Sequence, residues 1–297
     1  MRLLLSSLAA IATACAPTVS SIDWLVTAPR ILAVRAEPAE AKPGATASFS
    51  ALIAAPLGTS TGAPSWSFCV ATKPLTEDNI VSDACVGTSA LLAAGKGATI
   101  LAATPSNACS LFGPETQAGG ARPSDPDATG GYYQPLRVDL GATEPTFTLV
   151  RISCDLANAS AAAAATFAQA YVPNHNPQLL ALRASMGGSV VSLDAIPVGV
   201  HVSLTASWPT ASAETYAYYD SASDTVSTKR ESMALAWYAS SGALDQEATG
   251  RAEGDRATFS NNGWTAPPSG GSSQLWIVLR DSRGGVDFAS YQLTAIP

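Results

Sequence analysis

Apolar and polar residues alternate in short runs along most of the chain, and Gly, Pro, Ser or Asp punctuate these runs. Two clear examples are Ala45–Ile53 and Val200–Ala206. A period of two places successive side chains on opposite faces of a β-strand. Short strands separated by turn residues are typical of antiparallel sandwiches and barrels. The pattern therefore predicts an all-β protein.

The clearest local element is a hairpin near the C-terminus. The run Gln274–Arg280 predicts one strand and Val286–Leu293 predicts its partner. Between them lies the turn Asp281–Gly285, which ends in two glycines. Glycine adopts the positive φ angles that such turns require, so we expect Gly284 and Gly285 to form the tip of the hairpin.

An internal repeat suggests that one fold is used twice. Residues 29–36 read Pro-Arg-Ile-Leu-Ala-Val-Arg-Ala, and residues 177–184 read Pro-Gln-Leu-Leu-Ala-Leu-Arg-Ala. In each half, this opening is followed by a Gly/Pro turn and then by an alternating strand. A tryptophan in a short strand-like run comes later, Trp66 in the first half and Trp237 in the second. Self-similarity of this kind indicates repeated structural units. Large aromatics on central strands are usually core residues, so we expect both tryptophans to be buried.

The repeat divides the chain into two sandwich domains, residues 29–173 and 174–297. The polar stretch Asn174–Pro177 falls at the join and is expected to be a linker. Because the second half contains no cysteine, we expect it to fold as an independent unit.

Each domain is expected to carry an insertion. The first insertion, roughly Val70 to Gly131, is rich in Gly, Pro, Ser and Ala. Long loops with little regular structure are either functional or simply held in place by disulfides. The second covers Ala211–Arg230. The alanine-rich run Ala157–Ala165 has high helix propensity and predicts one short helix before a strand at Thr166–Val172.

Residues 1–14 have the features of a secretory signal peptide. One basic residue, Arg2, precedes a short apolar run, and small residues follow up to Cys15. The apolar run is too short to span a bilayer core of about 30 Å as a helix. The segment Ala12-Thr13-Ala14-Cys15 resembles the bacterial lipobox. This resemblance implies that Cys15 carries lipid and that residues 15–28 form a tether.

The alternative to lipidation is an ordinary cleavage near Ala14 that leaves Cys15 as a plain thiol. Lipidation is favoured because an odd cysteine in an exported chain requires an explanation. Ala16 follows Cys15 at the position where an inner-membrane retention signal commonly has Asp. We therefore expect an outer-membrane anchor, with membrane contact through the Cys15 lipid.

The four remaining cysteines, an even number, are expected to form two disulfides, because disulfides are common in exported proteins. Three connectivities exist, and the preferred one pairs Cys69 with Cys85 and Cys109 with Cys154. Zinc is the competing interpretation, but its sites usually contain closely spaced pairs such as C-x2-C, which this chain lacks. No metal site is therefore predicted.

The charge balance restricts the classes of partner. The formal net charge is −7 and charged residues are only 13% of the chain. Nucleic-acid binding needs a basic footprint, so no nucleic-acid partner is expected. No later segment has the long apolar run of a membrane-spanning helix, and membrane association is expected through the lipid alone.

Little in the sequence indicates catalysis. The two histidines, His175 in the linker and His201 in an alternating run, lie in no recognisable nucleophile motif, and we expect both to be solvated. Pairs of carboxylates occur in turn-like contexts, where Asp and Glu are ordinarily solvated. They are Glu77 with Asp78, Asp125 with Asp127, Asp220 with Asp224, and Glu253 with Asp255. No cofactor is predicted, and calcium bound by the Asp-rich loops is the alternative.

Grouped tyrosines are the candidate binding residues. They lie beside the two insertions, where exposed aromatics can form a patch for a protein or a glycan. These residues are Tyr132, Tyr133, Tyr216, Tyr218 and Tyr219. The competing interpretation is local packing over the edge of a sheet, which is the favoured one.

The repeated opening, the mid-domain tryptophans and the closing Arg280–Val286 hairpin resemble bacterial Ig-like and PKD-like extracellular modules. The chain also resembles predicted lipoproteins common in myxobacteria. This resemblance implies two tandem Ig-like sandwiches, each with its tryptophan between the sheets. The motifs that carry this resemblance are structural and specify no activity. Because no nucleophile–base set is visible and the insertions carry grouped tyrosines, we expect a non-catalytic, membrane-anchored protein that acts in binding, adhesion or envelope scaffolding, with a protein or glycan partner. The alternative is an extracytoplasmic hydrolase, or an accessory module of an enzyme, with its site in the first insertion.

Overall fold

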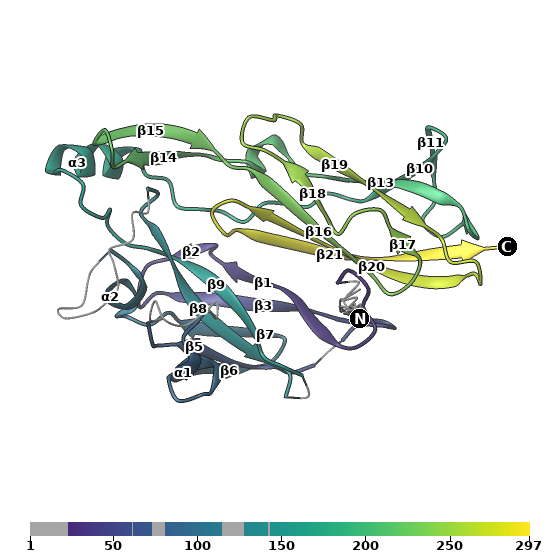
Figure 1. Cartoon of the computed structure of the whole chain (residues 1–297), viewed down its shortest axis with the longest axis horizontal. Coiled ribbons are helices and arrows are strands. Elements are labelled where there is room, and N and C mark those ends of the chain that lie inside the picture. Colours follow the sequence, from purple (N-terminus) through teal and green to yellow (C-terminus); the bar gives the residue numbers. More distant parts are fainter. Residues whose placement is uncertain (1–22, 61, 73–80, 115–127, 142) are drawn as a thin grey trace, which may run out of the picture.

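The computed structural model describes residues 23–60, 62–72, 81–114, 128–141 and 143–297, and two groups of sheets make up most of it (Figure 1). Residues 1–14, which are predicted to be a signal peptide, and Cys15 lie outside the described residues, as do Glu77, Asp78, Asp125 and Asp127. Within the described ranges, strands outweigh the three short α-helices. The all-β prediction is confirmed.

Two sheets form the first sandwich. One sheet contains β1 (Arg30–Glu37), β3 (Thr46–Ala55), β4 (Gly58–Thr59) and β7 (Thr99–Ala103), with β3 between β1 and β7. The other has the order β2 (Glu40–Ala41), β9 (Thr146–Ser153), β8 (Gly131–Asp139), β5 (Ser65–Cys69) and β6 (Leu91–Lys96). The alternating residues of β3 and β5 face each other across the core, where the Phe49 and Phe68 rings meet edge to face at 5.8 Å.

The second sandwich repeats this plan with its own core. One sheet has the order β11 (Ser189–Val191), β10 (Arg183–Met186), β13 (His201–Ser207), β19 (Phe259–Thr265) and β17 (Ala243–Leu244). The other has the order β12 (Ile196–Pro197), β21 (Val286–Ile296), β20 (Gly271–Asp281), β16 (Met233–Ala239) and β18 (Ala248–Arg251). Trp208, Trp237 and Trp264 are buried between these sheets.

The two sandwiches share their strand connections, which confirms the repeated fold. In each, the first strand pairs antiparallel with the alternating strand, β1 with β3 and β10 with β13. A two-residue strand then crosses to the other sheet and pairs parallel with the last strand, β2 with β9 and β12 with β21. The predicted core tryptophans occupy matching positions, because Trp66 lies on β5 and Trp237 on β16, and both are buried.

The first insertion is more regular than the sequence suggested. Residues 91–103 form β6 and β7, and β7 pairs with β3 over five residue pairs. These strands therefore belong to the sandwich and are not loop. The same insertion contains two short helices, α1 (Asp83–Val86) and α2 (Ala108–Phe112).

The predicted helix is shifted toward the C-terminus and replaces the strand expected at residues 166–172. Helix α3 covers Ala161–Ala170, and the Ser160 hydroxyl caps it by accepting a hydrogen bond from the backbone N–H of Ala163 at 3.2 Å. Phe167 of α3 packs against Ala217 and Tyr219. The latter two belong to a hairpin formed by β14 (Thr215–Asp220) and β15 (Thr225–Arg230), which follows a 3-10 turn at Thr210–Ser212. A helix from the first half thus packs on a hairpin from the second.

The C-terminal hairpin is confirmed, and its two glycines have different roles. Arg280 pairs with Val286 across the turn. Gly284 has a φ of +99°, a conformation that favours glycine, whereas Gly285 has no positive φ. A Cβ atom on Gly285 would lie 2.0 Å from an Asp281 carboxylate oxygen, so this glycine permits a close approach of the side chain.

Strand β20 joins the two sandwiches because it is buried on both faces. Leu275, Ile277 and Leu279 point into the core of the second sandwich. Trp276 and Val278 point the other way and pack against Leu32, Ala33, Leu52 and Ala54 of the first sandwich and against Val26. A continuous apolar run is typical of a strand covered on both sides. Because the second domain shares this apolar face with the first, its independent folding stays a prediction.

Candidate functional site

The join between the sandwiches is a strap, which we define as residues 171–176; Asn174 is buried within it, whereas Val172 and His175 are exposed. The backbone N–H of Asn174 donates to a Glu40 carboxylate oxygen at 2.9 Å, and its side-chain amide donates to Asp281 at 3.2 Å. The side chain of Asn176 donates to the backbone oxygen of Ala36 and accepts from the N–H of Val286. The polar stretch predicted as a linker is therefore tied to both sandwiches.

A buried ion pair lies under the strap in the first sandwich. The Arg151 Nε donates to a Glu40 carboxylate oxygen at 2.9 Å, and both side chains are almost wholly buried. The Tyr171 hydroxyl donates to the other Glu40 oxygen. A Cβ on Gly131 would lie 1.9 Å from the Arg151 guanidinium, so glycine at that position makes room for the buried cation.

A second charged cluster lies at the tip of the C-terminal hairpin. The buried Arg283 side chain donates to Glu231 at 2.7 Å, to Glu214 at 2.7 Å and to the backbone oxygen of Val172 in the strap at 2.9 Å. Its guanidinium also lies over the Tyr216 ring, 4.8 Å from the ring centroid. We call Glu214, Glu231, Asp281 and Arg283 the clasp.

The clasp holds three carboxylates and one cation, and the pKa values of Glu231 and Asp281 are raised. Burial and the nearby Asp281 charge raise the pKa of Glu231 to about 7, although Arg283 opposes the shift. Burial also raises the pKa of Asp281, against the backbone N–H groups of Gly285 and Arg283 that donate to it. One Glu231 oxygen accepts from Arg283 and the other from the backbone N–H of Glu214, so the structure occupies both of them.

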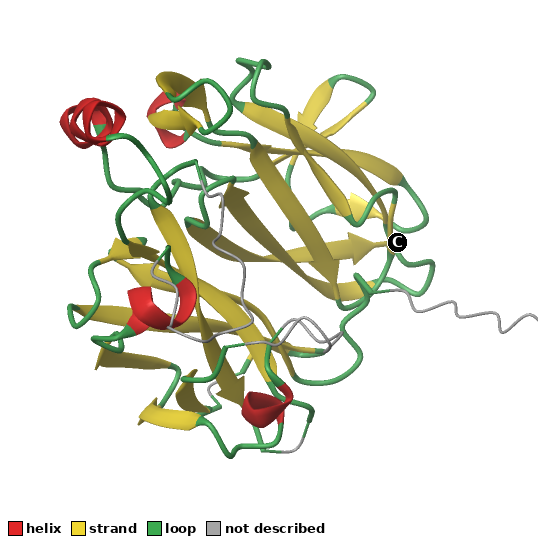
Figure 2. Cartoon of the chain, turned by 60° about the vertical axis from the view of Figure 1, so that its left-hand side comes forward, coloured by secondary structure: helices red, strands yellow, loops and turns green. Residues whose placement is uncertain are grey.

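A cavity lies beside α3. It has a volume of about 740 Å³, within the range of small-molecule sites. Its walls are mostly apolar or small and include the Cys109–Cys154 disulfide, with Lys42 and Asp155 as the charged lining residues. The other lining residues are Pro43, Ser153, Leu156, Ala159, Ala164, Phe167, Ala168 and Tyr171. We call this cavity the α3 pocket. Helix α3, which lines it, stands out from the sheets (Figure 2).

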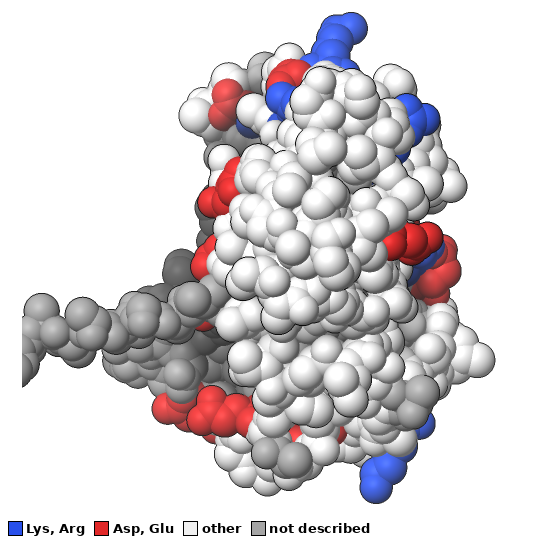
Figure 3. Space-filling view, turned by 90° about the vertical axis from the view of Figure 1, so that its right-hand side faces the viewer, with Lys and Arg blue, Asp and Glu red and all other residues white. Residues whose placement is uncertain are grey.

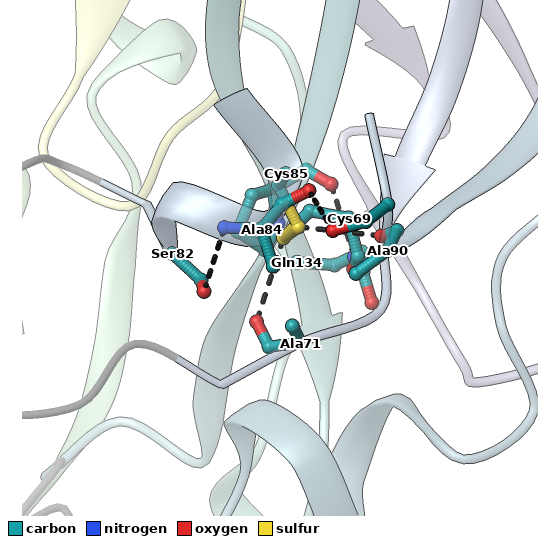
Figure 4. Close-up of a disulfide and its surroundings, with 9 residues drawn as sticks. Cys69, Ala71, Ser82, Ala84, Cys85, Ala90 and Gln134 are labelled. Atoms are coloured by element: carbon teal, nitrogen blue, oxygen red, sulfur yellow. Dashed lines mark hydrogen bonds between the residues drawn. A yellow bond between two sulfur atoms is a disulfide. The ribbon is translucent and has the colours of Figure 1, made fainter. Parts of the chain in front are cut away.

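Both predicted disulfides are present. Cys69 bonds to Cys85 and Cys109 bonds to Cys154, with Cα–Cα distances of 5.4 and 5.9 Å, within the usual range. Figure 4 shows the first of them between the end of β5 and helix α1. There the Gln134 side chain donates to the backbone oxygen of Cys69 at 2.7 Å. The disulfide thus fixes α1 to a buried part of the sandwich.

The tyrosines predicted as candidate binding residues do not form one exposed patch. Tyr132 is 1% exposed and Tyr219 is 3% exposed. The prediction of exposed binding residues is therefore wrong for these two tyrosines, and the alternative of local packing is confirmed for them. The Tyr133 hydroxyl donates to the Arg283 backbone oxygen, and Tyr216 lies against the Arg283 side chain. Tyr218 is half-buried, with the Lys229 ammonium 3.6 Å from its ring centroid.

The other residues considered for chemistry have ordinary structural roles. His175 and His201 are exposed, as expected, and pair with Glu214 at 2.8 Å and Asp245 at 3.0 Å. The remaining carboxylate pairs lie in turns, where hydrogen bonds to Asp220, Asp224 and Asp255 lower the pKa of each. No three His, Cys, Asp or Glu side chains among the described residues are grouped to hold a metal.

Within the same ranges, no helix combines the length and apolarity needed to cross a bilayer.

Comparisons with protein-family models and with curated proteins give no match. Among solved structures, the adhesin InvE of Yersinia pseudotuberculosis is 14% identical, with a TM-score of 0.25; the comparison covers 91% of this chain and 59% of that one. The fibronectin(III)-like modules of Clostridium thermocellum CbhA are 10% identical with a TM-score of 0.23, over 89% and 94% of the two chains. The C-terminal domain of AspA from Streptococcus pyogenes is 8% identical with a TM-score of 0.20, over 92% and 100%. Likeness at this level assigns no activity.

Proposed function

We propose that this chain is an exported, lipid-anchored and non-catalytic binding protein of the bacterial envelope, with the α3 pocket as its binding site. The observation that carries the proposal is the pocket itself, a cavity of about 740 Å³. Its lining contains one cation and one anion, Lys42 and Asp155, amid mostly apolar or small residues. Small-ligand sites and side-chain anchoring sites combine these features.

Rigid support on both sides of the pocket favours a binding role. The Cys109–Cys154 disulfide forms one wall, and α3 forms the facing wall through Phe167 and Ala164. Tyr171, at the end of α3, is fixed by its hydrogen bond to the buried Glu40. A preformed cavity loses less conformational entropy on binding than a mobile surface does.

Export and anchoring are supported by independent features of the chain. The N-terminal segment has the pattern of a secretory signal that ends at Cys15. The two disulfides are typical of proteins that fold in an oxidising compartment. A lipid at Cys15 would then place the protein on the membrane, and the outer membrane is the location we propose.

The α3 pocket lies far from the start of the described chain. In Figure 1, α3 and α2 are at the left-hand end, whereas the chain begins and ends toward the right. An anchored molecule of this shape can direct its pocket away from the bilayer, toward a soluble or envelope-bound partner.

The test is capture of a partner by crosslinking in intact cells with three forms of the full-length protein. Ala164→Trp fills the pocket, because Ala164 lines it and lies on the exposed side of α3. Ala165→Trp is the matched control, since Ala165 is also exposed on α3 but is not among the lining residues.

We expect wild type and Ala165→Trp to capture the same partner, and we expect Ala164→Trp to capture at least tenfold less of that partner. Equal capture by all three forms would place the binding site elsewhere. Hydrolytic activity of the purified protein that disappears in Asp155→Asn would contradict the non-catalytic role.

A further inference from the structure

One end of the molecule is nearly free of charge. Figure 3 shows this end face-on: the broad centre carries no acidic or basic side chains, and the coloured side chains lie around the rim. Five segments at this end contain no Asp, Glu, Lys or Arg, although charged residues such as Asp194 and Asp245 flank them in the sequence. The five uncharged segments are residues 54–60, 195–200, 239–244, 257–279 and 288–297. We call this surface the uncharged end.

These segments are distant in sequence but adjacent in the fold. Ala295 pairs with Gly271 on one side and with Ile196 on the other. The backbone N–H of Ser240 donates to the oxygen of Gln274 at 2.9 Å. A Cβ on Gly58 would lie 3.9 Å from the Gln274 side chain, which brings the β3–β4 turn of the first sandwich to the same end.

Exposed apolar side chains stand out from this end. Leu57, in the β3–β4 turn, is 97% exposed, and Ile296 at the last strand is 39% exposed. Val190, in the β10–β11 hairpin at the same end of the molecule in Figure 1, is 77% exposed. Single exposed apolar residues are common on soluble proteins. Here, however, Leu57 and Ile296 belong to segments that contain no charged residues.

The chain enters the described fold at this same end. The backbone N–H of Ala239 donates to the backbone oxygen of Trp24 at 3.0 Å, and the backbone N–H of Val26 donates to the backbone oxygen of Ala239 at 2.9 Å. Eight residue steps separate Cys15 from Asp23, the first described residue. A fully extended chain spans at most about 3.5 Å per residue, so a lipid on Cys15 holds Asp23 within about 28 Å of its anchoring point.

We infer that the uncharged end rests on the surface of the lipid bilayer. The inference depends on the proposed lipid at Cys15, which places a membrane within reach of this end. The overall charge of −7 disfavours adsorption to anionic headgroups through ionic contacts. The centre of the uncharged end can approach the bilayer without burying charged side chains (Figure 3), and Leu57 can insert at the acyl boundary.

This orientation directs the opposite end, which carries the α3 pocket, into the aqueous compartment. A short tether combined with a resting face would therefore fix both the height and the direction of the binding site. The membrane contact differs from the binding function proposed above, since it involves other residues at the other end of the molecule.

The experiment uses full-length lipidated protein on vesicles of phosphatidylethanolamine and phosphatidylglycerol. Ser272→Cys places an environment-sensitive fluorophore on the uncharged end, and Ser227→Cys places the same fluorophore on β15, near α3; both positions are exposed. Lipids that carry a nitroxide in the acyl chain quench only fluorophores that reach the bilayer. We expect quenching at position 272 to be at least threefold greater than at position 227.

Flotation of the vesicles separates this inference from the proposed anchoring. Protein that floats but shows equal quenching at the two positions would overturn the resting face while leaving the anchor intact. Protein that does not float would overturn both proposals. The fluorophore at position 272 could instead be shielded from solvent without nitroxide quenching, in a protein that sediments as a dimer. This result would assign the face to a second copy of the chain and overturn the membrane contact.

Discussion

Replacing Arg283 by Met should be among the most damaging single changes in this protein. The side chain is buried and satisfies Glu231, Glu214 and the backbone oxygen of Val172 at once. Methionine preserves much of the volume but removes the cation and every donor. Two carboxylates, one of them fully buried, are then left without their counter-ion.

The expected loss is about 3–5 kcal/mol at pH 7.5, the usual cost of breaking a buried ion pair from one side. A folded domain has roughly 5–15 kcal/mol of stability in total, so the variant should be marginal but measurable. The loss should be smaller at pH 5.5, because Glu231, whose pKa is already raised to about 7, takes up a proton when its counter-ion is absent.

Urea unfolding followed by tryptophan fluorescence at both pH values measures this effect. Arg256→Met is the control, because Arg256 is exposed and substitutions at such sites usually change stability by about 0.5 kcal/mol or less. A loss below about 1 kcal/mol for Arg283→Met at pH 7.5, or a loss independent of pH, would refute the argument that the clasp stabilises the fold.

Three further predictions concern titration, crosslinks and the domain interface. Because the folded-state pKa of Glu231 is raised, its contribution to stability is complete below its unfolded-state pKa and is lost as pH rises toward 7. Urea titrations should show the free energy of unfolding falling by up to about 3 kcal/mol over this range, and Glu231→Gln should abolish the fall. A wild-type free energy of unfolding that does not change with pH would contradict this prediction. Removing the Cys109–Cys154 disulfide should cost about 4 kcal/mol and removing Cys69–Cys85 about 3 kcal/mol, since the first closes the longer loop; a reversed order of melting temperatures would disagree. A fragment of residues 174–297 should self-associate in size-exclusion chromatography because it exposes Trp276, and Trp276→Lys should restore the monomer; a monomeric wild-type fragment would count against an apolar interface.

The parts of the fold that could be predicted from the sequence are those encoded locally. The alternation of residues 274–280 and 286–293 and the Gly-Gly turn predicted the C-terminal hairpin, with its ends off by a few residues. The repeated opening predicted a repeated topology, even though only the last two residues of the second copy, Arg183 and Ala184, lie in a regular strand. The presence of two disulfides followed from the even number of cysteines beyond Cys15 in a chain that we expect to be exported.

The parts that could not be predicted depend on contacts between distant residues. Glu40 and Arg151 pair across 111 positions, and Arg283 reaches Glu214 and Glu231 across 69 and 52 positions. Such pairs leave no periodic signal, and Arg283 reads as an ordinary turn residue in the sequence.

A signal was present for the interface between the sandwiches. The uninterrupted apolar run of residues 275–279 is the pattern of a strand buried on both faces, and Trp276 faces the first sandwich as that pattern implies. The α3 pocket had no such signal, because it forms between a helix, a disulfide and a strand end that are separated in sequence.

The central claim, that this is an anchored protein of the envelope, is tested most directly by metabolic labelling of cells with an alkynyl fatty acid. Wild-type protein should incorporate the label and fractionate with membranes, whereas Cys15→Ser should carry no label and leave the membrane fraction, because the proposed lipid attaches through that sulfur. Label that persists in Cys15→Ser, or unlabelled wild-type protein, would contradict the account.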